Sequence, residues 1–157
     1  MNLLNKKKNV GMALIEILIG AAIISMGVLA ISTSYTEYYK YALANQKNIE
    51  AAYLLEEGLE VVTFFRDTSW TNISNLSTTT TYYLIFSSAW ATTTTAQYVD
   101  GVFLRSFNVS DVLRDGNDDI ASSGTYDPNT KKVTFSTVYW QGHATTTKIM
   151  SVYITNL

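Results

Sequence analysis

The chain has 157 residues, enough for one domain of moderate size and too few for two of ordinary size. Its formal charge of −2, from 11 basic and 13 acidic side chains, gives no basic surface of the kind that nucleic acid binding requires. The sequence contains no cysteine, which excludes disulfides, thiolate metal sites and cysteine nucleophiles.

An apolar run dominates the start of the chain. Three lysines, Lys6, Lys7 and Lys8, precede it, and residues 12–31 are mostly apolar positions with a single charge, Glu16. As a helix this run would extend about 30 Å, which is enough to cross a bilayer. By the positive-inside rule, the lysines place the N-terminus in the cytoplasm and the rest of the chain outside.

The helix is expected to continue beyond the apolar run. Between Thr33 and Asp67 there is no proline, and the only glycine is Gly58. Apolar residues recur there at three- and four-residue spacing, which is typical of one buried helix face. They are Ile49, Ala52, Leu55, Leu59, Val62 and Phe65. The sequence therefore predicts one helix that runs from the membrane segment to about Phe65, with an amphipathic second half.

The composition changes after the helix to that of loops and strands. Residues 68–77 are rich in Ser, Thr and Asn and predict a loop. Strands are predicted from β-type runs, of which the last two alternate clearly, at 82–87, 102–109, 132–139 and 148–155. Turns are predicted at 115–119 and 127–129. The expected fold is α+β: a long N-terminal helix, half transmembrane and half amphipathic, packed on a small antiparallel sheet.

The acidic segment 115–119 matches part of the ligand spacing of a calcium loop. Asp115, Asn117 and Asp119 offer oxygen ligands at alternate positions. The glycine that such a loop needs at its sixth position is replaced by Ile120, and the glutamate at its twelfth by Tyr126. An acidic turn is therefore favoured over a calcium site, and no metal is predicted.

Three helix carboxylates, Glu56, Glu57 and Glu60, could suggest acid–base chemistry. The chain has one histidine, His143, in a predicted hairpin loop, and offers no partner set for them. We interpret them as a solvated or subunit-contacting helix face. Walker-type, G-x-S-x-G and G-x-G-x-x-G sequences are also absent. The sequence therefore predicts neither an enzyme nor a cofactor.

The carboxylate of Glu16 is unusual in such an apolar run. It would cost about 2.5–3.5 kcal/mol at the bilayer centre and less near its edge. A hydrated position at the interface is one interpretation, whereas an ionisable group in a membrane segment more often has a function and a partner. A secretory signal peptide is a further alternative, but Glu16 interrupts its apolar core and residues 30–32 make a poor cleavage site.

The residues around this carboxylate resemble the processing motif of type IV prepilins and pseudopilins. Gly11-Met12-Ala13-Leu14-Ile15-Glu16 follows a short basic leader and opens the apolar run. The resemblance implies that prepilin peptidase cuts between Gly11 and Met12 and that Met12 becomes N-methylated. It also implies that Glu16 pairs with the N-terminal amine of an adjoining subunit. Because a buried carboxylate is tolerated only when paired, this contact would select the register between subunits.

A second resemblance, to pilus modification proteins of the minor-pilin V kind, concerns two segments. They are residues 51–62, with the following Phe65-Arg66-Asp67 and Trp70, and residues 127–133 leading into Tyr139-Trp140. Departures from the common pilin pattern favour a minor pilin or pseudopilin over a Gram-negative major pilin. These departures are Met12 in place of phenylalanine, Ala13 in place of threonine, Thr33 in place of a helix-kinking proline, and the lack of a cysteine pair.

The resemblance implies four segments: a cleaved basic leader at 1–11, a hydrophobic membrane and fibre-core helix at 12–34, its amphipathic continuation at 35–67, and a β-rich domain at 68–157. The implied function is that of a structural subunit of a type IV pilus-like fibre, inserted first in the inner membrane and then assembled at the cell surface. The expected partners are prepilin peptidase, other pilin subunits, the inner-membrane assembly platform and the membrane. Two alternatives stay open: a pseudopilin of a type II secretion or competence system, and an uncleaved membrane-anchored domain that binds a surface.

Overall fold

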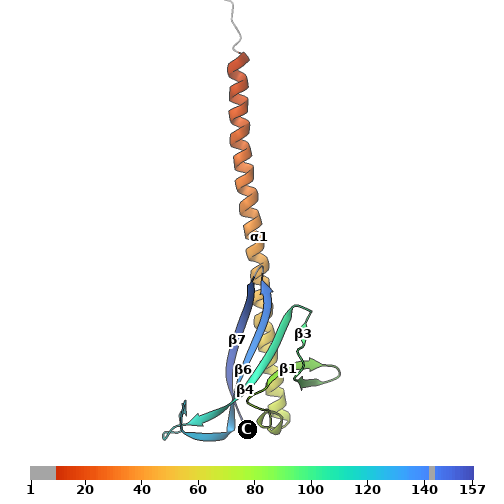
Figure 1. Cartoon of the computed structure of the whole chain (residues 1–157), viewed down its shortest axis with the longest axis vertical. Helices are drawn as coiled ribbons and strands as arrows, with labels where there is room; N and C mark the ends of the chain where they lie inside the picture. The colour runs from red at the N-terminus through yellow and green to blue at the C-terminus, as the bar shows by residue number, and fades with distance from the viewer. Residues whose placement is uncertain (1–9, 142–143) are drawn as a thin grey trace, which may run out of the picture. The chain divides into compact units, whose positions relative to one another are not determined.

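The computed structural model describes residues 10–141 and 144–157. The expected α+β fold is confirmed: a long N-terminal helix, α1 (Val10–Thr68), is followed by an antiparallel sheet of seven strands against which it packs (Figure 1). The chain divides into two compact units, Met1–Asn45 and Gln46–Leu157, which are described separately below. The leader lysines Lys6, Lys7 and Lys8 lie outside the described residues.

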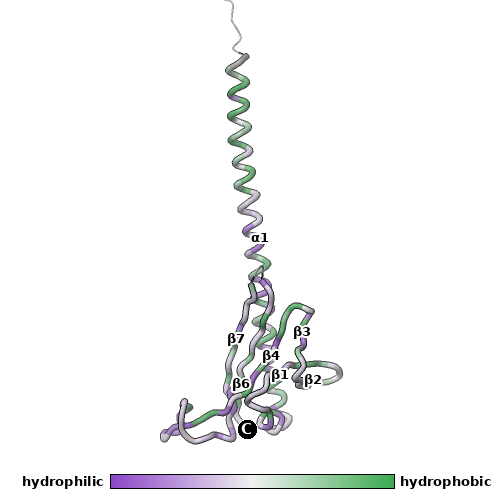
Figure 2. The backbone as a smooth tube through the Cα atoms, viewed as in Figure 1, coloured by the Kyte–Doolittle hydropathy of each residue, from purple (hydrophilic) through white to green (hydrophobic). Residues whose placement is uncertain are grey.

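Helix α1 ends at Thr68, close to the end predicted from the sequence. In the N-terminal unit α1 consists mostly of apolar residues, shown in green in Figure 2. The hydroxyls of Ser25, Thr33 and Thr36 donate hydrogen bonds of 2.7–2.9 Å to carbonyl oxygens four residues earlier in the same helix. Because these hydroxyls bond within the helix, the polar side chains need no partner outside it and are compatible with an apolar surrounding.

The sheet contains four strands that the sequence predicted and three that it did not. The predicted ones are β1 (Thr81–Phe86), β4 (Phe103–Arg114), β6 (Thr125–Gln141) and β7 (Ala144–Thr155). The others are β2 (Trp90–Thr93), β3 (Tyr98–Val99) and β5 (Ile120–Ala121). The order is β2-β1-β4-β6-β7, with β3 and β5 paired to β4, and β4, β6 and β7 run side by side (Figure 1). A short helix, α2 (Thr71–Ser74), lies in the segment predicted as a loop.

The core of the second unit lies between α1 and the sheet. Strands β4 and β6 contribute Phe107, Val109, Val133 and Phe135, each at most 1% exposed. The predicted helix stripe is partly wrong, because Ile49 is 56% exposed and Ala52 is exposed. At the start of the buried face the buried residue is Ala51, one position before the predicted Ala52. The buried face consists of Ala51, Leu55, Val61, Val62 and Phe65.

Gly58 allows α1 to lie close to the sheet. A Cβ atom at this position would lie 3.0 Å from Cδ1 of Phe135, whose ring is fully buried. That distance is shorter than ordinary van der Waals contact, and a close-packed core has no free volume nearby into which the ring could move. The only glycine of the helix's second half therefore lies where helix and sheet approach each other closely.

The turn predicted at 127–129 is wrong, since these residues lie within β6. The pairing with β4 shifts there: Asp111 faces Lys131, but Val112 faces Asp127. Pro128 falls in the resulting bulge, where its missing N–H removes no ladder hydrogen bond. The turn predicted at 115–119 is confirmed between β4 and β5, where the N–H of Asp115 donates to the carbonyl of Asp119 over 2.9 Å.

Candidate assembly site

The N-terminal unit presents an uncovered apolar surface. Its large apolar side chains from Met12 to Ile31 are all more than half exposed, and Met12 itself is 71% exposed. Within the described part of the chain, α1 is the one helix that is long and apolar enough to span a membrane. An apolar surface of this extent is stable only against lipid or other apolar surfaces.

Small residues form a narrow stripe on this part of α1. Ala13, Gly20 and Gly27 are seven residues apart, so they share one helix face. A Cβ atom added at Gly20 or Gly27 would meet nothing within 4 Å, so the space above both glycines is open. Small residues on an apolar helix let the backbone of a second helix approach closely.

Glu16 lies beside this stripe, three residues after Ala13. Its side chain is exposed, and no ion pair involves it among residues 10–141 and 144–157. The predicted cleavage site, Gly11 and Met12, lies within the first turn of α1 as the structure describes it. The structure thus brings the site residues Gly11, Met12 and Glu16 onto adjacent turns of one helix.

In the β-rich unit an ion pair between a buried arginine and a partly exposed glutamate connects α1 to the sheet. Arg105 on β4 is 4% exposed and pairs with Glu57 of α1. Its guanidinium also lies 5.6 Å from the ring centre of Trp90. Glu57 was predicted to belong to a solvated or subunit-contacting face, and that interpretation overlooked Arg105. The available signal was the pattern Phe103-x-Arg105-x-Phe107, which places arginine on the inward face of a strand.

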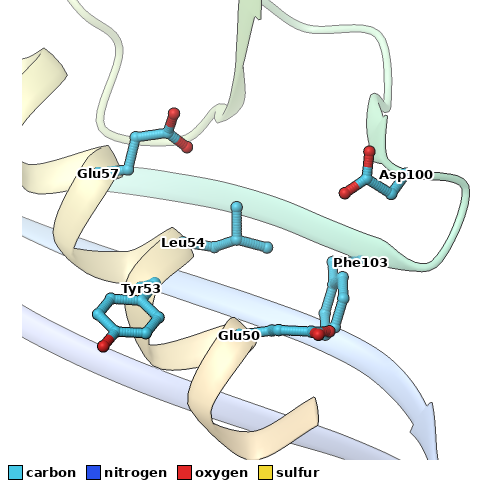
Figure 3. A pocket seen from close by; sticks show the side chains of 6 residues that line it. All are labelled: Glu50, Tyr53, Leu54, Glu57, Asp100 and Phe103. Atoms are coloured by element: carbon cyan, nitrogen blue, oxygen red, sulfur yellow. The ribbon is translucent and has the colours of Figure 1, made fainter. Parts of the chain in front are cut away.

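A groove of about 360 Å³ opens beside this ion pair (Figure 3). Its apolar lining comes from Tyr53 and Leu54 of α1 and Phe103 of β4. Its carboxylates are those of Glu50, Glu57 and Asp100. This arrangement suits a cationic group on an apolar stem. In the described part of the chain, no three His, Cys, Asp or Glu side chains are grouped so that they could hold a metal ion.

The position of Asp100 depends on a tight turn between β3 and β4. Asp100 and Gly101 both adopt positive φ, +51° and +67°, and the N–H of Val102 donates to the carbonyl of Val99 over 3.0 Å. Positive φ at both central residues is the pattern of a type I′ turn, for which Asp-Gly is one of the preferred sequences. The turn therefore fixes one carboxylate at the rim of the groove.

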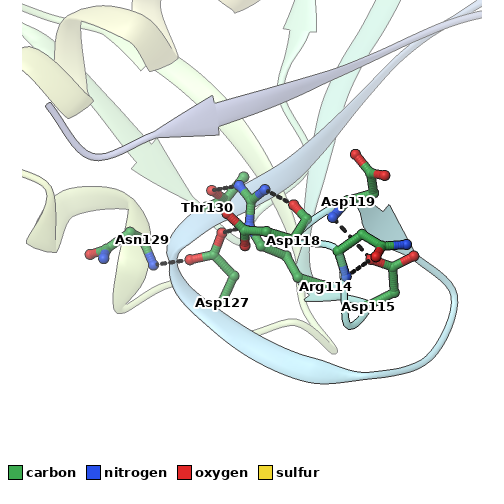
Figure 4. A network of polar contacts seen from close by, with 8 residues as sticks. Arg114, Asp115, Asp118, Asp119, Asp127, Asn129 and Thr130 are labelled. Atoms are coloured by element: carbon green, nitrogen blue, oxygen red, sulfur yellow. Dashed lines mark hydrogen bonds and ion pairs between the residues drawn. The ribbon is translucent and has the colours of Figure 1, made fainter.

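A polar network surrounds Arg114 at the end of β4 (Figure 4). Its Nε donates to Asp127 over 2.7 Å, and its other nitrogens donate to the carbonyl of Asp118 and the hydroxyl of Thr130. The hydrogen bond from Arg114, with further ones from Thr130 and the N–H of Asn129, lowers the pKa of Asp127 to about 2. The same bond to Asp127 raises the pKa of Arg114. The network stabilises the bulge in β6.

The calcium candidates Asp115, Asn117 and Asp119 lie in one loop next to this network. The Oδ1 atom of Asp115 accepts hydrogen bonds from the backbone N–H groups of Asn117 and Asp119, over 2.8 and 3.1 Å. This carboxylate therefore stabilises the turn through local bonds of the kind that aspartate commonly makes there.

Comparisons of the chain with models of protein families, with curated proteins and with solved structures find no match.

Proposed function

We propose that the protein is a prepilin-like structural subunit of a type IV pilus-like fibre. Prepilin peptidase would cut between Gly11 and Met12, and α1 would then assemble with the helices of other subunits. The single observation that carries the proposal is the coincidence, at the start of one helix, of a basic leader, Gly11, Glu16 and an uncovered apolar surface.

The exposed apolar surface supports two successive environments for α1. Before assembly, a bilayer would cover it, with the N-terminus in the cytoplasm as the leader lysines favour. After assembly, the helices of neighbouring subunits would cover it. The stripe of Ala13, Gly20 and Gly27 supports the second environment, since it permits close helix contact.

Glu16 would act as the register contact between subunits. Its carboxylate lies next to the small-residue stripe and, in the described part of the chain, has no cation of its own. Once buried among helices it needs a positive partner, and the amine that cleavage creates at Met12 of a neighbour has the required charge. The assembly platform and the peptidase are the further partners that this function requires.

The N-terminal peptide of the protein, taken from membranes and from sheared surface material, tests the proposal by mass spectrometry. A peptide that begins at Met12 and is one methyl group heavier would support it. Surface material that still carries Lys6, Lys7 and Lys8 would contradict it and favour an anchored surface-binding domain. A peptide that begins after Ala30 or Ser32 would identify a signal peptide. The length of the assemblies, long fibres or short ones within the cell envelope, separates a pilin from a pseudopilin.

A further inference from the structure

We propose that the groove lined by Tyr53, Leu54, Phe103 and Asp100 receives the Lys148 side chain of a second copy of this chain. The β-rich domains of neighbouring copies would then contact one another from edge to edge. The inference rests on the proposed function, since it requires copies that assemble side by side.

The groove has the chemistry to bind a lysine side chain. Leu54 and Phe103 give it apolar walls against which a four-carbon stem can lie, and the ring of Tyr53 is 64% exposed. Glu50 and Asp100 supply carboxylates, and neither forms an ion pair with any residue that the structure describes. An ammonium group placed here would therefore meet opposite charge and an aromatic face together.

Lys148 is placed to reach such a groove on another copy. It is exposed, it lies on β7, and no ion pair involves it among the described residues. Strand β7 ends the order β2-β1-β4-β6-β7 and pairs with β6, so its other side is an open edge of twelve residues. An unpaired strand edge is a ready surface for association, and a lysine on it limits association to partners that offer negative charge.

The sheet register places the two surfaces at the same level. Lys148 faces Thr137 on β6, and Thr137 faces Arg105 on β4, so the three residues form one row across the sheet. Arg105 pairs with Glu57, which lines the groove. Because residues opposite each other share a face and Thr137 is buried, Lys148 projects from the face on which α1 packs. Lys148 is thus level with the Glu57 end of the groove, and β6 lies between them.

The two surfaces differ, so the contact would be heterologous. A copy that offers its groove to one neighbour still has Lys148 for the next, and such contacts repeat along an open assembly instead of closing a pair. Within one chain the two surfaces cannot meet. The row of Arg105, Thr137 and Lys148 spans two strand spacings, roughly 10 Å, from β4 to β7.

Cysteine cross-linking of the full-length protein in cells tests the contact. Because the chain has no cysteine, Asp100→Cys and Lys148→Cys can be placed in two copies with different tags. A bismaleimide with a short spacer, which replaces the length of the lysine stem, is expected to yield a cross-linked dimer with both tags. The control pair, Asp100→Cys with Lys132→Cys, uses a lysine that faces Tyr153 on the other face of the sheet and is expected to give roughly tenfold less product.

A charge exchange tests the same contact without cysteines. Asp100→Lys is expected to lower the assembled fraction by roughly fivefold, and a second change, Lys148→Asp, to restore it. Asp119→Lys, which makes the same change of charge on an exposed carboxylate of the turn between β4 and β5, outside the groove, is the matched control and should leave assembly unchanged.

The outcomes separate this inference from the proposed function. If the N-terminal peptide begins at Met12 and fibres form, but the cysteine pair does not cross-link and Asp100→Lys assembles normally, the groove contact is wrong and the subunit function stands. If Asp100→Cys cross-links instead to a different protein, that protein occupies the groove and the proposal of a second copy is wrong. If the leader is retained and no assemblies form, both proposals fail.

Discussion

Buried cations in the β-rich unit each have a carboxylate partner from another strand or helix. Arg105 of β4 pairs with Glu57 of α1, and Lys131 of β6 pairs with Asp111 of β4, while both cations are only 4% exposed. Burial lowers the pKa of Lys131, but its hydrogen bonds to Asp111 and Tyr126 outweigh that effect and leave the pKa raised. Removing the carboxylate of such a pair leaves the buried cation without its compensating charge, which is destabilising.

The carboxylate of Asp127 should make stability depend on pH in the acid range. Its pKa is lowered from 3.8 to about 2 in the folded protein, so the unfolded chain binds a proton more readily. The stabilisation is therefore complete above about pH 5 and is lost as the pH falls through 4 towards 2. In Asp127→Asn the free energy of unfolding should be lower than in the wild type at pH 6 and should vary less between pH 5 and 2. Denaturant titrations monitored by tryptophan fluorescence at each pH measure it.

A matched control for this titration is Asp119→Asn. The side chain of Asp119 is exposed, and only its backbone takes part in the turn hydrogen bonds described above. The pH dependence of this variant should therefore resemble that of the wild type. An Asp127→Asn protein that retains the full acid dependence would show that Arg114 and Asp127 do not form the pair in solution.

At the scale of elements, α1 can lie close to the sheet because Gly58 has no side chain. Gly58 faces Phe135, and neighbouring buried positions on the helix carry Leu55 and Val62. Glycine in a helix interior is unfavourable by roughly 0.5–1 kcal/mol relative to alanine. The close contact with a fully buried ring gives a physical reason for glycine at this position.

Substitution of Gly58 by a larger residue should separate helix and sheet. Gly58→Leu is expected to lower the free energy of unfolding by about 1–3 kcal/mol, because the added side chain must displace Phe135 from a filled core. The control is Gly116→Leu, at a position where a Cβ atom meets nothing within 4 Å and where a change within about 0.5 kcal/mol is expected. Equal stability of the two variants in denaturant titrations would contradict the close approach.

At the scale of the whole molecule, the two units expose different surfaces. The second unit has a buried apolar core of its own, whereas in the first the large apolar side chains from Met12 to Ile31 are all more than half exposed. A chain with this division carries one folded domain and one segment that needs partners. Under the proposed function, insertion in the membrane and assembly should therefore be separable by mutation.

Glu16→Leu is the variant that should separate them. Without the carboxylate, α1 is more apolar and should enter the membrane at least as well as in the wild type. Assembly should fall more than tenfold, since loss of one member of a buried pair costs about 3–5 kcal/mol. Glu37→Leu, at an exposed carboxylate that pairs with Lys40, is the control and should assemble normally. The measurement is the amount of protein in membrane and sheared fractions, and normal assembly of Glu16→Leu would refute its role as a register contact.

Some features of this protein follow from the sequence by itself because they depend on neighbours in the chain. The extent of α1 and the positions of β1, β4, β6 and β7 follow from hydrophobic periodicity, which records the local geometry of helix and strand. The grouping of Gly11, Met12 and Glu16 next to the apolar run is likewise visible in the linear sequence. The stripe of Ala13, Gly20 and Gly27 likewise depends only on their seven-residue spacing in the sequence.

Other features were decided only in the tertiary structure. Strands β2, β3 and β5 have two to four residues, too few to establish a period, and they form because a longer strand offers them an edge. The bulge at Pro128 depends on the register between β4 and β6. Glu57 and Arg105 are 48 residues apart, and their pairing, like the groove beside it, exists only once α1 lies on the sheet. Contacts between distant segments depend on how whole elements pack, and no local pattern of residues encodes that.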